Sequence, residues 1–212
     1  NSIQETVDLM YDAWDLAEKY RHPVEIMSEA ALGQMMEPVA FPEFKEGPQD
    51  LAWSWDGTNR DHGKIANTER PAAIKAKIAL MQENEQRWES YMTEDAEYIF
   101  VAFGLPSRSS KNAVNQLREK GEKVGLIRPI SVWPFPHKAF AKLKAQNKNL
   151  KGFVSVESTD AGQLIEDVAL AAKKIGANVP VYGLFTGQHI PKAKDVIGIY
   201  ENIKAGKEKE VF

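Results

Sequence analysis

Apolar residues near the start of the chain recur at the spacing of a helix, with polar residues between them. This set consists of Val7, Met10, Tyr11, Trp14 and Ala17. Such spacing places the apolar side chains on one helical face, and Ser2 followed by Glu5 has the spacing of an N-terminal capping box. The pattern predicts an amphipathic helix over residues 4–20, which ends before Pro23 because proline cannot continue it.

The segment that follows has no sustained period. Residues 24–27 form a short apolar run, which predicts a short buried strand. Residues 33–36 precede two prolines, and this arrangement favours a loop or a short helix.

Residues 43–68 combine proline, glycine and many polar residues with Trp53 and Trp55. They predict a connection whose tryptophans pack against another surface, and not a flexible tether. Pro71 then precedes apolar residues at helical intervals, so a long charged helix is predicted over residues 71–91.

In the second half of the chain, short apolar runs alternate with amphipathic segments. The predicted strands cover residues 98–103, 123–127, 152–156 and 181–185. The predicted helices cover residues 109–120, 138–144, 162–175 and 193–203. Nearly continuous apolar strands are typical of a parallel sheet that is buried on both faces, and alternating strands and helices are joined by right-handed crossovers. The predicted fold class is therefore α/β, a parallel sheet with helices on both faces.

Composition narrows the functional classes. The chain has 212 residues, 43% of them hydrophobic, and a net charge of −3 with acidic and basic residues interspersed. Nucleic-acid binding is not expected, because it requires clustered lysine and arginine. The absence of cysteine and of a long apolar run argues against disulfides, membrane spanning and secretion, so the expected location is cytoplasmic.

Metal chemistry is not expected from this sequence. Without cysteine the chain cannot supply thiolates to an iron-sulfur cluster or to a thiolate zinc site. The four histidines, which lack metal-ligand spacing, are His22, His62, His137 and His189. Residues 53–63 contain acids and a histidine but not the spacing of a calcium loop, so turn chemistry is the simpler interpretation.

Candidate binding residues follow the predicted strands, because ligands of parallel sheets bind at the carboxyl ends of the strands. Residues 104–110 place three serine hydroxyls and Arg108 at a predicted helix start, which suits an anion; Ser107 as an ordinary N-cap explains most of this pattern. Arg128 follows an apolar strand and suits either a structural or intersubunit ion pair or carboxylate recognition.

The loop after the third predicted strand offers a second set of candidates. Asp160 and Gln163 have capping spacing, and Gly162 allows close packing of the helix start, which is the favoured interpretation. Glu157, at the strand end, could act as a general acid or base if it is partly buried, although the sequence identifies no titratable partner for it.

Several segments together resemble one enzyme family. These segments cover residues 20–24, 28–39, 93–98, 128–136 and 157–168. In this collinear order they resemble the alpha subunit of the thiamine-dependent 2-oxoacid:ferredoxin oxidoreductases, and the branched-chain (2-oxoisovalerate) type is the best match.

The resemblance implies a transketolase C-terminal-like domain at residues 95–212. It is preceded by the C-terminal part of a thiamine-pyrimidine-binding domain at residues 1–45 and by a linker with a bridging helix at residues 46–94. It places the catalytic residues upstream of Asn1, so none is assigned within this chain. Leu32, Gly33 and Gln34 are expected beside the cofactor cleft.

The implied activity is oxidative decarboxylation of a 2-oxoacid with coenzyme A to acyl-CoA, with electrons passed to ferredoxin. The implied cofactors are thiamine diphosphate and magnesium in the assembled enzyme and iron-sulfur clusters in a partner subunit, with none bound to this fragment. The implied partners are a thiamine-diphosphate-binding beta subunit, gamma and ferredoxin-like iron-sulfur subunits, and ferredoxin.

Alternative functions remain open from the sequence. A 2-oxoglutarate or pyruvate:ferredoxin oxidoreductase alpha subunit would carry similar segments. The beta chain of a lipoamide-linked dehydrogenase would share the second domain, and electron-acceptor preference separates it. A noncatalytic α/β interaction module would be a stable monomer, whereas the enzyme would co-purify with thiamine-binding and iron-sulfur subunits.

Overall fold

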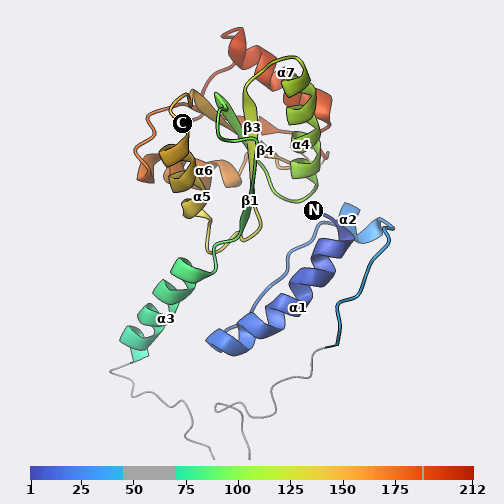
Figure 1. Ribbon diagram of the computed structural model, residues 1–212, viewed down its shortest axis with the longest axis vertical. Coiled ribbons are helices and arrows are strands. Elements are labelled where there is room, and N and C mark those ends of the chain that lie inside the picture. The colour runs from blue at the N-terminus through green and yellow to red at the C-terminus, as the bar shows by residue number, and fades with distance from the viewer. Residues whose placement is uncertain (45–69, 188) are drawn as a thin grey trace, which may run out of the picture.

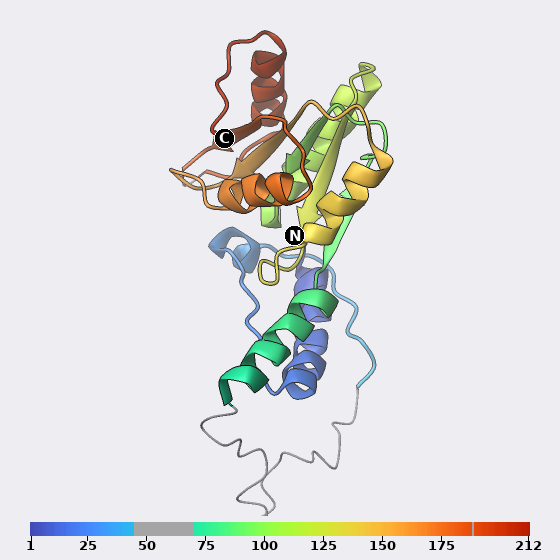
Figure 2. The same cartoon turned by 90° about the vertical axis from the view of Figure 1, so that its left-hand side faces the viewer.

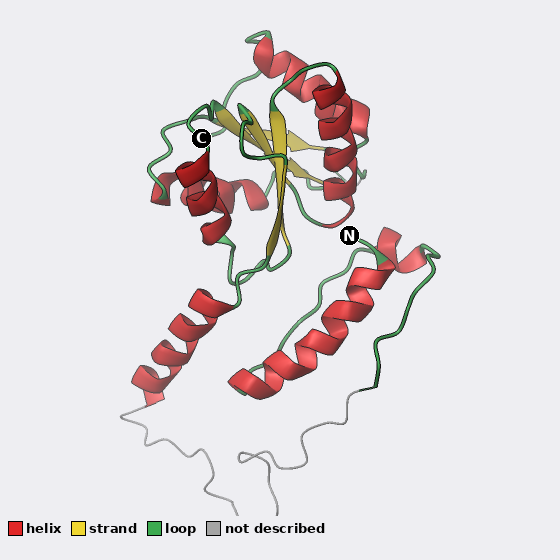
Figure 3. Ribbon diagram, in the orientation of Figure 1, coloured by secondary structure: helices red, strands yellow, loops and turns green. Residues whose placement is uncertain are grey.

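The described residues form a five-stranded mixed sheet with helices on both faces (Figure 3). The structure, a computed structural model, describes residues 1–44, 70–187 and 189–212. The strands are β1 (Trp88–Tyr91), β2 (Tyr98–Val101), β3 (Val124–Pro129), β4 (Gly152–Glu157) and β5 (Val181–Phe185). In the order β1-β3-β2-β4-β5, strands β2 to β5 are parallel and β1 pairs antiparallel with β3.

Two helices cover each face of the sheet, as the alternation of side chains along the strands requires (Figure 1). On one face, Ile99 and Val101 pack against α5 (His137–Gln146) and α6 (Leu164–Lys174). On the other face, Phe100 packs against α4 (Gly104–Glu119) and α7 (Ala193–Lys204). The predicted α/β architecture with helices on both faces is confirmed.

The N-terminal helices lie beyond the carboxyl ends of the parallel strands (Figures 1 and 2). They are α1 (Ile3–Tyr20), α2 (Ala30–Gln34) and α3 (Arg70–Asn84). The end of α1 meets the end of α3 through Glu85, which accepts hydrogen bonds from Lys19 Nζ at 2.8 Å and from the Tyr20 hydroxyl. Among the described residues, no helix is both long enough and apolar enough to cross a membrane.

The first helix agrees with its prediction. It spans Ile3–Tyr20, and the Glu5 N–H donates to the Ser2 Oγ at 3.1 Å, which is half of the predicted capping box. The Glu5 carboxylate is directed elsewhere and pairs with Arg128 at 2.8 Å. Helices α5, α6 and α7 and strands β2 to β5 also lie where the alternating pattern predicts them, within a few residues.

Two predicted elements are wrong. Residues 24–27 are not a strand: Val24 and Met27 are exposed, and the sheet offers this run no neighbour. The helix predicted over 71–91 ends at Asn84, and Trp88–Tyr91 turns into β1. These residues pair with β3, a partner that local spacing cannot reveal.

One further element begins earlier than predicted, and one predicted segment lies mostly outside the described residues. The helix predicted from Ser109 begins five residues earlier, at Gly104. Most of the predicted connection, residues 45–68 with Trp53 and Trp55, lies outside the described residues.

Candidate functional site at the carboxyl edge of the sheet

The carboxyl edge of the sheet has a topological switch point between β2 and β4, where the strand order reverses. From β2 the chain passes through α4 to β3 on one side, while β4 and β5 extend the sheet on the other side. Parallel α/β sheets bind ligands in the crevice outside such a point. Residues 102–104 and 158–162 flank it here, so this edge is where a ligand is expected to bind.

The start of α4 is occupied by a carboxylate from the N-terminal segment. The Leu105 N–H donates to Glu29 Oε1 at 3.0 Å, across 76 positions of sequence. Gly104 has a φ of +58°, and a Cβ at this position would lie 3.2 Å from the same oxygen. The N-terminus of a helix favours negative charge, so Glu29 occupies the helix start that the sequence marks as suited to an anion.

The serines of this segment serve the helix itself, which corrects the predicted N-cap. Phe103 is the N-cap residue, and Ser107 lies buried inside α4 with its Oγ donating to the Gly104 carbonyl at 2.6 Å. Ser110 Oγ likewise donates to the Pro106 carbonyl at 2.9 Å.

Arg108 contacts the N-terminal segment. It pairs with Glu37 at 2.8 Å. The Ile3 N–H also donates to Glu37, and these two donors hold the pKa of the Glu37 carboxyl below its usual value. The predicted cation at this helix start is therefore matched by a carboxylate of the same chain.

The predicted cofactor-binding residues belong to α2, which follows Glu29 directly. Leu32 is buried, whereas Gly33 and Gln34 are exposed. A Cβ added at Gly33 would meet nothing within 4 Å. Because Glu29 reaches α4, the three residues lie near the carboxyl edge, with open space on the side of Gly33 and Gln34.

Glu157 caps α6 through its buried side chain. Its Oε2 accepts from the Gln163 and Leu164 N–H groups at 2.7 and 2.9 Å. Its Oε1 accepts from the Ile165 N–H at 3.0 Å and from Ser155 Oγ at 2.8 Å. Four donors therefore satisfy the two oxygens, so the geometry supports a structural cap in place of the predicted acid or base.

The predicted capping pair of Asp160 and Gln163 is wrong. Gln163 occupies the N-cap position without a side-chain hydrogen bond, and Asp160 is exposed near Gly187. Thr159 takes the local capping role, because its Oγ1 accepts from the Gly162 N–H at 3.0 Å.

Gly162 permits close packing, as the sequence predicts. It has a φ of +78°, and a Cβ there would lie 2.4 Å from the Phe185 ring. Gly183 meets the same ring, at 2.3 Å from its own ideal Cβ. Two glycines thus make room for one aromatic side chain at the end of β5.

Arg128 forms the predicted structural ion pair, within the chain. Its guanidinium lies 2.8 Å from Glu5 of α1 and 2.9 Å from Glu89 of β1, and only 10% of its side chain is exposed. Glu89 also pairs with Lys111 of α4 at 2.6 Å. Burial raises the pKa of the Glu89 carboxyl, but the hydrogen bonds from Lys111 and Arg128 outweigh it and hold that pKa below its usual value.

The histidines are not brought together in the described part of the chain. His137 starts α5 with its Nε2 2.9 Å from Lys174 Nζ, and burial together with the lysine charge lowers its pKa. His62 lies outside the described residues. Within the described ranges, no group of three or more histidine, aspartate or glutamate side chains is placed to hold a metal ion.

Sequence reasoning missed the two contacts that organise this edge. Glu29 reaches Leu105 from a distant segment, and no local pattern marks that reach. The Phe185 contact had a partial signal, because Gly183 interrupts an apolar strand two residues before an aromatic residue, and glycine in a strand often marks a close approach.

Comparisons with known proteins agree with this architecture. Residues 96–196 match the family described as pyruvate:ferredoxin oxidoreductase core domain II. Ketoisovalerate oxidoreductase subunit VorB of Methanothermobacter marburgensis is 41% identical over 182 residues, covering 81% of this chain and 51% of that protein. The 2-oxoglutarate synthase subunit KorA of Methanocaldococcus jannaschii is 30% identical over 207 residues, covering 82% of this chain and 55% of that protein.

A solved structure shares the fold. The 2-oxoglutarate:ferredoxin oxidoreductase from Magnetococcus marinus aligns with a TM-score of 0.53 and 14% identity, over 66% of this chain and 24% of that chain. The chain spans about half the length of the curated relatives it matches. From the matched domain and these relatives, the chain belongs to the family of 2-oxoacid:ferredoxin oxidoreductase subunits.

Proposed function

We propose that the whole protein is the alpha subunit of a cytoplasmic, branched-chain 2-oxoacid:ferredoxin oxidoreductase. This enzyme converts a 2-oxoacid and coenzyme A to acyl-CoA and carbon dioxide, and passes two electrons to ferredoxin. The observation that carries the substrate class is the 41% identity to a ketoisovalerate oxidoreductase subunit, against 30% to a 2-oxoglutarate synthase subunit, over similar shares of this chain.

Within that enzyme, this part of the chain acts as a scaffold. Glu157 caps α6 and Arg128 pairs with Glu5 and Glu89, which supports structural roles for both side chains. Glu29 attaches the segment of Leu32, Gly33 and Gln34 to the carboxyl edge of the sheet. The scaffold therefore presents these residues to the cofactor cleft.

The family's cofactors do not fit the residues that the structure describes. Iron-sulfur clusters require thiolates, and the chain has no cysteine. The magnesium of thiamine diphosphate requires clustered oxygen ligands, and the described residues offer no such group. Thiamine diphosphate supplies carbanion chemistry when bound. We assign it to other parts of the alpha subunit together with the beta subunit, and we assign the clusters to gamma and ferredoxin-like partners.

The test is reconstitution of the full-length protein with its partner subunits. We expect coenzyme-A-dependent reduction of ferredoxin with 2-oxoisovalerate to exceed that with 2-oxoglutarate or pyruvate by at least tenfold in kcat/KM. Preference for 2-oxoglutarate would reassign the substrate. A stable monomer that recruits no thiamine-binding or iron-sulfur subunit would support the noncatalytic module instead.

Gln34→Ala tests the cleft position within the reconstituted enzyme. One polar contact is worth about 0.5–1.5 kcal/mol, so turnover should fall about threefold to tenfold while Tm stays unchanged. Gln116→Ala, on the exposed face of α4, is the matched control and should change neither quantity. Normal kinetics in an intact Gln34→Ala complex would remove α2 from the site.

A further inference from the structure

Strand β5 is the edge of the sheet beyond β4, and its backbone groups alternate between the two sides. Pro180 and Thr186 face β4, because Phe153 N–H donates to the Pro180 carbonyl at 3.0 Å and Thr186 N–H to the Glu157 carbonyl at 3.1 Å. Val181, of opposite parity, faces outward. The outward set on this strand therefore also includes Gly183 and Phe185.

The chain already places its own residues against the start of this outer edge. Val181 N–H donates to the Phe212 carbonyl at 2.9 Å, and Val211 N–H donates to the Val181 carbonyl at 2.9 Å. No described residue pairs with the outward N–H and C=O groups of Gly183 and Phe185. The edge therefore forms strand-like hydrogen bonds at Val181, whereas no described residue pairs with the outward backbone groups of the residues that follow.

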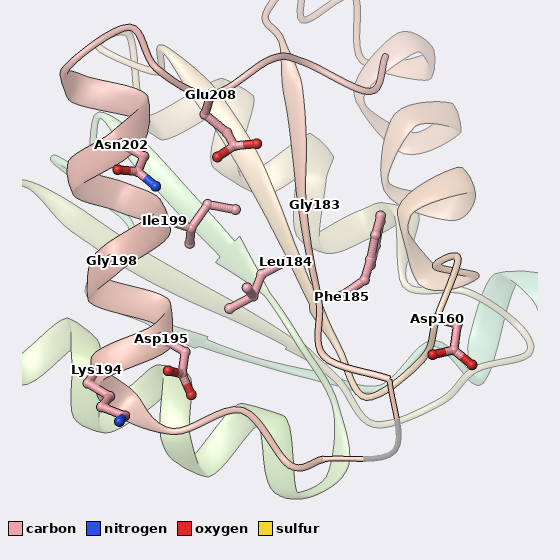
Figure 4. Close-up of a pocket in the computed structure, with 10 residues that line it drawn as sticks. All are labelled: Asp160, Gly183, Leu184, Phe185, Lys194, Asp195, Gly198, Ile199, Asn202 and Glu208. Atoms are coloured by element: carbon pink, nitrogen blue, oxygen red, sulfur yellow. The ribbon is translucent and has the colours of Figure 1, made fainter.

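A groove runs beside this open edge, between β5 and α7 (Figure 4). Its volume is about 620 Å³. Leu184 and Ile199 form an apolar patch between the strand and the helix, and a Cβ added at Gly198 would meet nothing within 4 Å. The groove has room for side chains that project from a segment paired with β5.

The charged side chains that line the groove are mostly acidic. Asp160, Asp195 and Glu208 contribute three carboxylates, and Lys194 contributes one ammonium group. Figure 4 shows Glu208 and Asp195 near opposite ends of the strand and helix, with Asp160 beyond Phe185. A bound segment with basic side chains would be complementary to this arrangement.

We propose that the open edge of β5 and its groove bind an extended segment of a partner protein that carries basic side chains. The segment adds a strand beside Gly183 and Phe185, so the backbone groups give affinity and the groove selects side chains. Val211 and Phe212 limit the added strand at the Val181 end. This binding mode is independent of the oxidoreductase assignment.

A second copy of the chain is a poorer occupant than a basic segment. Antiparallel pairing of two β5 edges about a two-fold axis would bring Asp160 of one copy towards Glu208 of the other, because these two residues lie near opposite ends of the strand. Like charges placed opposite one another at an interface are unfavourable. Charge complementarity therefore favours a different polypeptide.

The experiment compares the tagged full-length protein alone with its complex with the subunits that co-purify with it. Residue-resolved hydrogen exchange is measured on both samples. Exchange at the Gly183 and Phe185 amides should slow at least tenfold in the complex. Leu184 faces β4 and serves as the internal control, so its exchange should be unchanged. Equal exchange at Gly183 and Phe185 in both samples overturns the proposal.

The charge reversals Asp160→Lys and Glu208→Lys, combined, test the partner's chemistry. Partner affinity should fall at least tenfold, whereas Glu201→Lys, an exposed α7 position outside the groove, should leave it unchanged. Circular dichroism confirms that each variant is folded. Cross-linking from Asn202 should map to a basic extended segment of a co-purified subunit. Unchanged partner affinity of the double variant contradicts the proposal. Slower exchange at Gly183 and Phe185 with rising concentration of the protein alone also contradicts it and indicates that two copies of the chain pair with each other.

Discussion

Glu157 belongs to a strand, but its side chain caps a helix that begins seven residues later. It ends β4, yet its carboxylate accepts the first N–H groups of α6, including that of Leu164. The side chain is 4% exposed. A buried carboxylate is stable only when hydrogen bonds replace water, and the four donors around it meet that requirement.

Glu157→Gln should therefore destabilise the protein markedly. The amide keeps one acceptor oxygen and turns an N–H₂ group towards backbone donors, so the free energy of unfolding should fall by about 2–3 kcal/mol. Urea denaturation measures the change. Glu166→Gln, an exposed first-turn position of α6, is the control and should stay within about 0.5 kcal/mol of the parent. Equal losses in the free energy of unfolding for the two variants would show that the buried cap does not stabilise the protein more than an exposed glutamate does.

At the scale of elements, the end of β5 and the start of α6 fit together around one ring. Phe185 lies against both Gly162 and Gly183, at distances that no real Cβ could occupy without a shift. Interiors are packed as densely as organic crystals, so such a shift would displace the ring or the helix start. The two glycines set how closely α6 approaches the strand.

Gly162→Ala should lower the free energy of unfolding by about 2–4 kcal/mol, because overpacking adds to the strain of a positive φ. Gly121→Ala is the matched control, since Gly121 has a φ of +83° but its added Cβ would meet nothing within 4 Å. That variant should lose only about 1–2 kcal/mol. Thermal or urea unfolding gives both values, and a Gly162→Ala loss no larger than that of Gly121→Ala would contradict the packing argument.

Elements with local signals were predictable, and those with distant partners were not. Residues 181–185 form an apolar run that predicts β5 with its observed bounds. Strand β1 was missed because Trp88–Tyr91 continues an apolar helical pattern, and only pairing with β3 makes it extended. The start of α4 was missed because its carboxylate, Glu29, comes from a separate segment. The same long-range contact brings α2 to the candidate site, so sequence spacing could not place that site.

At the scale of the whole molecule, a chain of charges connects the N-terminal segment to the sheet. Glu5 of α1, Arg128 of β3, Glu89 of β1 and Lys111 of α4 form consecutive ion pairs at 2.8, 2.9 and 2.6 Å. Because Arg128 is shared between two carboxylates and is mostly buried, loss of either partner leaves part of its charge uncompensated.

This network should make stability depend on pH. The pKa of Glu89 is lower in the folded protein than the ordinary value of 4.5. Its stabilising contribution is therefore complete above that value and is lost as the pH falls through the lower, folded pKa. Glu89→Gln should reduce stability at pH 7, and its difference from the parent should shrink below about pH 4.5. Urea unfolding between pH 7 and pH 3 checks this, with exposed Glu94→Gln as the control; a constant difference would contradict it.

The ion pair between Glu5 and Arg128 cannot form until the ribosome has synthesised the segment that contains β3. Arg128 lies 123 positions after Glu5, so at about 5–20 residues per second a ribosome releases α1 about 6–25 s before its partner in the sheet. During that interval α1 has no docking site on β3. Trp14, which stays 68% exposed even in the folded chain, is then accessible together with the rest of the apolar face. The rate of synthesis thus sets how long the apolar face of α1 stays exposed to solvent and to chaperones before it can dock on the sheet.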